Sequence, residues 1–251
     1  MAAGDWDQRL TSLPLPEVIG QSAQGRPIRA GRFGQPGTTA TLLVVAGVHG
    51  DEASSVDGVI DLLECLLGEA PPAAPPAFWV IPALNPDGLL RDQKNNARDV
   101  DLNRNFPARN FSPLHKPGYF PGAAALSEPE TQALADFLGR QPTIDRVVAV
   151  HAPFACVNFD GPAQAWAETV SRACGWPVQA DIGYPTPGSL GSWLGHDRGW
   201  PILTLELPAG PFPGFAAACR AALASAVGAT ARGDSAGALH RGNAMNPERI
   251  R

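Results

Sequence analysis

The chain has 251 residues, of which 44% are hydrophobic, and its mean hydropathy is −0.08, so it can bury a sizeable core as one domain of the larger α/β type. Its formal net charge is −5, and its 19 lysine and arginine residues are dispersed, which argues against a nucleic-acid partner. No apolar run approaches a membrane span, and the N-terminus has no apolar leader, so we expect a cytoplasmic protein without a membrane partner. The four cysteines show no paired spacing and are expected to be small buried hydrophobes.

The first predicted element is a hairpin over residues 17–34, where two short alternating segments flank a Gly-Arg-Pro turn. Such a pair is typical of the edge of a sheet. The apolar run Thr41–Val48 predicts a central strand that is buried on both faces. Apolar residues then recur every three or four positions, so residues 53–69 are predicted to form an amphipathic helix.

His49 and Glu52 lie between this strand and this helix, three residues apart. A turn in this position opens into the cleft above the carboxyl edge of a parallel sheet. Imidazole and carboxylate are ligands that suit Zn²⁺, and two of them so close in sequence need only one more to make an open catalytic site. The same spacing also occurs in solvated helix starts, so a third ligand is needed to decide between the two interpretations.

The next segments alternate between connectors and buried structure. Residues 70–77 are rich in proline and predict a stiff connector within the domain. Residues 78–84 predict a second buried strand, and the sequence Asn-Pro-Asp-Gly at 85–88 has a turn residue at every position. The long aperiodic stretch 89–120 contains the polar cluster DLNRNFP, and it is either a solvated loop or a functional one.

Ser127 and Glu130 have the spacing of a capping box with proline in the first turn, which predicts a helix to about Leu138. No catalytic role is needed to explain the acidic residues of this segment. The other predicted elements without site residues are a helix at 166–174 and a helix at 214–229. Residues 179–193 form a glycine- and proline-rich loop.

Two further strands each deliver one functional candidate. Residues 145–150 predict a buried strand with His151 at its carboxyl end, and as a parallel neighbour of the first strand it would aim His151 at His49 and complete the metal set. Residues 201–205 predict a fourth buried strand that carries Glu206 at its end. A carboxylate that leaves an apolar strand beside a metal is a candidate general base.

The four buried strands, separated by helices, predict one α/β domain over residues 1–231. Helices are expected to cover both faces of a mixed, mainly parallel sheet, which makes a three-layer α/β/α arrangement. Residues 232–251 are polar and aperiodic and are expected to form a partly disordered tail.

With these residues in hand, the chain resembles the zinc carboxypeptidase family and, within it, the bacterial murein peptide amidases. The resemblance covers about residues 19–207 and rests on the segments IGQSAQGRPI, HGDE, NPDG, VDLNRNFP, SEPETQAL and GYPTPGSLGSW. It implies one Zn²⁺ per chain held by His49, Glu52 and His151, the His₂Glu set of carboxypeptidase A. It also implies that Glu206 is the catalytic carboxylate, and that the bond before Pro153 is cis.

The resemblance also assigns residues to the substrate. Asn103 and Arg104 match the pair that holds the substrate carboxylate, a task suited to a planar guanidinium. Tyr184 has the spacing of the mobile tyrosine of the family. The arginine that stabilises the oxyanion in the family is replaced here, and Lys94 and Arg91 are both candidates for its role.

Gly191 aligns near the position that sets side-chain preference in the family. A glycine there is expected to leave room for a long side chain, and to provide neither an apolar wall nor an acid that selects lysine. Ser189, Ser192 and Asp51 are then candidate partners for the charged end of a diaminopimelate side chain. Asp51 itself replaces an arginine of the digestive enzymes.

The function implied is zinc-dependent hydrolysis of the γ-D-glutamyl-meso-diaminopimelate bond of murein peptides during cell-wall recycling. The partner would be a murein tripeptide or a related small peptide, and the protein a monomer or a homodimer. Two alternatives are a zinc amidohydrolase of the succinylglutamate desuccinylase and aspartoacylase type, and a catalytically inactive peptide-binding homologue. His115, His196 and His240 are expected to take no part in the metal site.

Overall fold

The computed structural model describes residues 5–68, 76–208 and 215–226. In this part of the chain eight strands form one sheet in the order β1-β2-β4-β3-β5-β8-β6-β7. The strands are β1 (Glu17–Gln21), β2 (Pro27–Phe33), β3 (Leu42–Val45), β4 (Phe78–Ile81), β5 (Arg146–His151), β6 (Phe154–Asp160), β7 (Val178–Gln179) and β8 (Ile202–Pro208).

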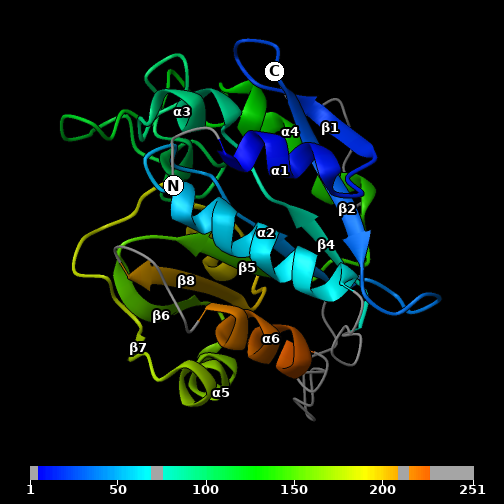
Figure 1. Cartoon of the computed structure of the whole chain (residues 1–251). Helices are drawn as coiled ribbons and strands as arrows, with labels where there is room; N and C mark the ends of the chain where they lie inside the picture. The colour runs from blue at the N-terminus through cyan, green and yellow to red at the C-terminus, as the bar shows by residue number, and fades with distance from the viewer. Residues whose placement is uncertain (1–4, 69–75, 209–214, 227–251) are drawn as a thin grey trace.

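The helices lie on both faces of this sheet, so the predicted three-layer α/β domain is confirmed. They are α1 (Asp5–Ser12), α2 (Ala53–Leu67), α3 (Pro86–Arg91), α4 (Pro129–Arg140), α5 (Gln164–Cys174) and α6 (Phe215–Ala226), with a 3-10 turn η1 (Leu102–Arg104) and a π-helical turn η2 (Gly191–His196). In Figure 1, α2 crosses in front of the sheet with α6 and α5 below it, and α4 lies behind. No helix in the described ranges combines the length and apolarity needed to cross a bilayer.

The centre of the sheet is parallel, and on each side it is joined to the next strand by an antiparallel pair. Strands β4, β3, β5 and β8 run parallel to one another, while β2 pairs antiparallel with β4 and β6 pairs antiparallel with β8. Because the four central strands share a direction, their carboxyl ends meet at one edge, where an open α/β sheet binds its ligands.

Strand β3 is buried on both faces, as its continuous apolar sequence predicts. Leu42 and Val44 join the core that contains α2, α5 and α6. Leu43 and Val45 join a second core on the opposite face, against α4. Side chains of a strand alternate between faces, so one apolar run supplies both cores and holds the end of β3 in place.

Several sequence predictions need correction. The segment 85–88 begins helix α3 instead of a simple turn, because Asn85 caps it with its side chain on the backbone N–H of Gly88 at 2.9 Å. Helix α4 forms as predicted, but Glu128 and not Ser127 is its N-cap, and no capping box forms. Strand β6 and helix α1 were not predicted at all. The expected tail, residues 232–251, lies outside the described residues.

Candidate metal centre and active site

His49, Glu52 and His151 converge at the carboxyl edge of the sheet. His49 follows β3, His151 ends the neighbouring parallel strand β5, and Glu52 stands at the start of α2. The Nδ1 atom of His49 lies 2.8 Å from Oε1 of Glu52, and Nδ1 of His151 lies 2.9 Å from Oε2. One ligand atom from each residue falls within 4.8 Å of the others, so these three side chains could hold one metal ion.

The electrostatics of this cluster favour a cation. Burial alone would raise the pKa of Glu52, but His151 and His49 outweigh it and hold that pKa well below its usual range. Burial opposes a charge on His49, yet Glu52 and Asp101 outweigh it and raise the pKa of His49 to about 10. The imidazole of His49 therefore retains a proton against these carboxylates, and a divalent cation that binds here would displace that proton.

Asp101 orients His49 by contacting the ring nitrogen that faces away from Glu52, and this role was not predicted. Its Oδ1 atom lies 3.1 Å from Nε2 of His49 and accepts the backbone N–H of Asn103 at 2.9 Å. The Nζ atom of Lys94 lies 3.0 Å from Oδ2 of Asp101 and forms an ion pair with it, but the angles at this contact are not those of a hydrogen bond. A carboxylate on the outer nitrogen of a ligating histidine sets its tautomer and raises its basicity. The available signal was the position of Asp101 at the start of the DLNR cluster.

Glu206 lies beside the metal cluster, as predicted. It is the register partner of His151 across β5 and β8 and is only 6% exposed. Its Oε2 atom is buried and accepts no hydrogen bond from the described residues. Burial raises the pKa of Glu206, and Glu52 raises it further while His151 lowers it. A buried carboxylate with an unused oxygen and a raised pKa can accept a proton from a water molecule in the cavity.

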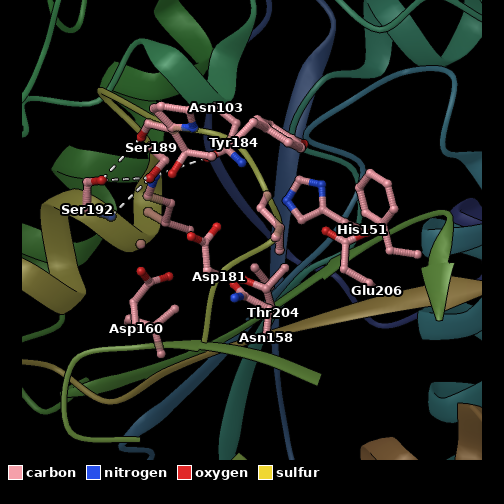
Figure 2. Close-up of a pocket in the computed structure, with 18 of the residues that line it drawn as sticks. Asn103, His151, Asn158, Asp160, Asp181, Tyr184, Ser189, Ser192, Thr204 and Glu206 are labelled. Carbon is pink, nitrogen blue, oxygen red and sulfur yellow. Dashed lines mark hydrogen bonds between the residues drawn. The ribbon is translucent and has the colours of Figure 1, made fainter. Parts of the chain in front are cut away.

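One cavity of about 650 Å³ joins this cluster to the predicted substrate residues. Asn103 and Arg104 line it from η1, and Tyr184 lines it from the loop before η2 (Figure 2). The Arg104 guanidinium is buried, and its one hydrogen bond within the described residues goes to the Asn103 carbonyl. The Asn103 side-chain oxygen accepts the backbone N–H of Leu190 at 3.0 Å. Donors of both residues thus remain available to an anion in the cavity.

The NPDG segment holds the metal turn against the substrate loop. The Asn85 side chain is fully buried and donates to the carbonyls of Val48 and Lys94. A Cβ atom on Gly50 would lie 2.0 Å from the backbone carbon of Gly88. The two backbones can approach so closely only because residue 50 is glycine, while a Cβ atom on Gly88 would instead lie 2.4 Å from the side-chain nitrogen of Asn85.

Lys94 and Arg91 are placed very differently. Lys94 contacts Asp101 as described, and its Nζ lies 3.5 Å from the ring centre of Tyr119. Arg91, the last residue of α3, is exposed and donates to the carbonyls of Asp87 and Asn96. Neither residue lines the 650 Å³ cavity, but only Lys94 is coupled to the metal cluster, through Asp101.

The space over Gly191 is not open, contrary to prediction. A Cβ atom there would lie 2.0 Å from Oδ2 of Asp160, at the end of the unpredicted strand β6. The carboxylate of Asp160 on β6 therefore occupies the cavity wall at Gly191, where the sequence had predicted no acid. Ser189 and Ser192 also line the cavity, but their hydroxyls bond to each other at 3.1 Å.

Three smaller predictions can also be compared with the structure. The bond between Ala152 and Pro153 is cis, as predicted. Among the described residues, His115 and His196 lie outside the candidate metal group, and His240 lies outside the described ranges. Asp51 is exposed and does not line the cavity.

Similarity to known proteins agrees with this geometry. The family model described as zinc carboxypeptidase matches residues 11–173, a range that ends before Glu206. Murein peptide amidase A of Escherichia coli K12 is 36% identical over 209 residues, which cover 78% of this chain and 82% of that protein. The corresponding protein of Vibrio campbellii is 33% identical over 80% of this chain and 82% of its own length. The crystal structure of the murein-tripeptide amidase of Escherichia coli O157 superposes with a TM-score of 0.67 at 30% identity, over 89% of this chain and 94% of that one.

Proposed function

The chain belongs to the zinc carboxypeptidase family and is a zinc metallopeptidase, and from that premise we propose that it releases meso-diaminopimelate from murein peptides by cutting the amide bond to γ-D-glutamate. The observation that carries the proposal is the single cavity that contains both the metal cluster and the buried Arg104 guanidinium. The relatives named murein peptide amidase A supply the substrate class.

The donor set fits zinc. Two imidazoles and a carboxylate are a known catalytic zinc set that leaves one position open, and His49, Glu52 and His151 would supply it. Zn²⁺, when bound, polarises the scissile carbonyl and lowers the pKa of water. The buried Oε2 of Glu206 supports this arrangement, because it has no hydrogen-bond partner among the described residues and a buried acceptor is expected to find its partner in the working site.

The residues of the chain would divide the reaction as follows. Glu206 takes the proton of the attacking water and passes it to the leaving amine. Lys94 is favoured over Arg91 for the charge that develops on the carbonyl oxygen, because it is the one that lies against Asp101 beside the metal cluster. Asn103 and Arg104 hold the carboxylate of the released residue through paired donors, and Tyr184 covers the cavity.

A carboxylate grip fits diaminopimelate because its own α-carboxylate stands next to the amide that is cut. Arg104 is the only cavity-lining residue of the described chain with a permanent positive charge. Within the described residues Arg104 forms no ion pair, and a buried cation without such a partner is unfavourable, so Arg104 is expected to bind an anion. We place the reaction in the cytoplasm, which agrees with four free cysteines.

A panel of three peptides tests the substrate. Zinc-loaded protein is assayed with L-Ala-γ-D-Glu-meso-diaminopimelate, with the same peptide ending in lysine, and with an α-linked peptide of equal length. The highest kcat/KM is expected for the first, because a site built for charged groups leaves them unpaired when an analogue lacks one. Equal or better cleavage of the other two would overturn the substrate assignment and leave the peptidase chemistry intact.

A further inference from the structure

Asp160 stands in the cavity wall in an arrangement built around its carboxylate. It is the last residue of β6, and its side chain packs against η2 at two glycines. A Cβ atom on Gly191 would lie 2.0 Å from Oδ2, and one on Gly195 would lie 2.5 Å from the Asp160 Cβ. Neither glycine has a positive φ, so the backbone conformation does not require glycine at these positions. The missing side chains instead leave the space that Asp160 occupies.

Among the described residues, only one oxygen of this carboxylate has a polar partner. Oδ1 lies 2.9 Å from Nε2 of His196, and Oδ2 accepts no hydrogen bond from the part of the chain that the structure describes. Burial raises the pKa of Asp160, while His196 lowers it, so the carboxylate is incompletely compensated by its surroundings. A partly buried carboxylate with a free oxygen facing a cavity favours a cationic partner.

The charges of the cavity are separated along it. Figure 2 shows Asn103, the neighbour of Arg104, at the top of the view and Asp160 at the bottom, with its carboxylate directed into the cavity. Asp181 adds a second negative charge, but it is exposed and its Oδ1 already accepts the backbone N–H of Gly183 at 2.7 Å. Asn158 and Thr204 line the wall near Asp160 and carry no charge.

We propose that Asp160 is a specificity-determining residue that binds a primary ammonium group at the far end of the side chain of the released residue. The proposal rests on the proposed function, in which Arg104 holds the carboxylate of that residue at the other end. A side chain that reaches from Arg104 to Asp160 must be long and must end in a positive charge. Diaminopimelate has such a group, since it carries a second amine at the end of its chain.

His196 holds the carboxylate in position. Its ring binds Oδ1, so Oδ2 is the oxygen that remains for the ammonium. Gly191 fixes the same geometry from the other side, because any larger residue would displace Oδ2. The loop glycines and the histidine therefore act through Asp160 and need not touch the substrate.

The test compares two peptides that differ only in the distal amine. The first is L-Ala-γ-D-Glu-meso-diaminopimelate, and the second ends in 2-aminopimelate, which keeps the distal carboxylate and lacks the amine. The wild-type protein is expected to prefer the first by about 10- to 100-fold in kcat/KM, the range for a hydrogen bond to a charged group. The Asp160→Asn variant, checked for zinc content and melting temperature, is expected to bring the ratio to within about threefold of one.

Asp181→Asn is the matched control, because it removes a carboxylate from the same cavity and is expected to keep the preference. Equal loss in both variants would indicate general electrostatics and would overturn a specific role for Asp160. An unchanged ratio in Asp160→Asn would overturn it as well. If that variant does not fold, the wild-type ratio decides, and a ratio near one contradicts the proposal. Failure of the proposed function is distinct, because then the wild-type protein cleaves neither peptide.

Discussion

His151 and Glu206 are register partners on adjacent parallel strands, β5 and β8. Paired positions on neighbouring strands present their side chains to the same side of a sheet. The sheet therefore places a candidate metal ligand and a candidate base next to each other without any loop between them. Both side chains are buried, at 4% and 6% exposure, so their relative position is set by the packed core.

Loss of His151 is expected to abolish zinc binding. In His151→Ala, only two candidate ligands remain, which is too few for a stable site. Metal analysis after extensive dialysis should fall from one zinc per chain to nearly none. His115→Ala is the control, since that residue is exposed and bonds to the Pro113 carbonyl. Stoichiometric zinc in His151→Ala would remove this residue from the metal set.

Asp101 is expected to tune the metal without contacting it. Asp101→Asn keeps the shape of the side chain but weakens its hold on His49, so zinc affinity should fall about 10- to 100-fold. Competition with a chelator measures this directly. The control is Asp145→Asn, which changes a carboxylate paired with Arg146 at the start of β5. Equal affinities in the two variants would contradict an orienting role for Asp101.

The candidates for oxyanion stabilisation can be separated by a pair of variants. Lys94→Met is expected to lower kcat by about 10²- to 10³-fold with little change in KM, the usual effect of losing one such donor. Arg91→Met should leave kcat within a few-fold of wild type, since the hydrogen bonds of Arg91 within the described residues go to the backbone carbonyls of Asp87 and Asn96. The opposite outcome would transfer the role to Arg91.

The preference for a distal ammonium should depend on pH. Burial raises the pKa of Asp160 against the opposing effect of His196, and only the ionised carboxylate pairs with an ammonium. The ratio of kcat/KM for the two distal-amine peptides should therefore fall on acidification, and at a higher pH than an ordinary aspartate would cause. His196 pairs with this carboxylate, and Asp181 is a further acid that lines the same cavity.

Loss of metal in acid affects both peptides equally, so it cancels in this ratio. The same pKa shift has a consequence for stability. The folded chain binds a proton at Asp160 more readily than the unfolded chain, so ionisation of Asp160 lowers stability as the pH rises through this range. A ratio that is flat with pH in the wild type, or one that falls equally in Asp160→Asn, would contradict the assignment.

The parts of the fold that could be predicted from the sequence are those with strong apolar patterns. The strand β3 was predicted in the right place, although it ends at Val45 and not at Val48, and helix α2 was predicted to within two residues. The meeting of His49 and His151 was predicted because parallel strands bring their carboxyl ends together. Strand β6 was missed for two reasons. Most of its residues are only partly buried, so its sequence has no strong apolar pattern, and it directly follows Pro153, a residue type that usually indicates a turn.

The missed strand had a consequence for the site. Asp160 ends β6, so the sequence interpretation of Gly191 as open space lacked the residue that fills it. Ser127 and Glu130 show the same limit. Their spacing fits a capping box, but Glu130 instead accepts the backbone N–H of Ala23 at 2.8 Å. Contacts between residues 107 positions apart cannot be inferred from local spacing.

The most direct test of the central claim is the turnover of L-Ala-γ-D-Glu-meso-diaminopimelate by wild-type protein and by Glu206→Gln, both loaded with zinc. The amide keeps the shape of the side chain but cannot take the proton of water, so zinc content and melting temperature should match. We predict cleavage to diaminopimelate by the wild type and a fall in kcat of about 10²- to 10⁴-fold in the variant. No cleavage by fully zinc-loaded wild-type protein, or near-normal turnover by Glu206→Gln, would contradict the account.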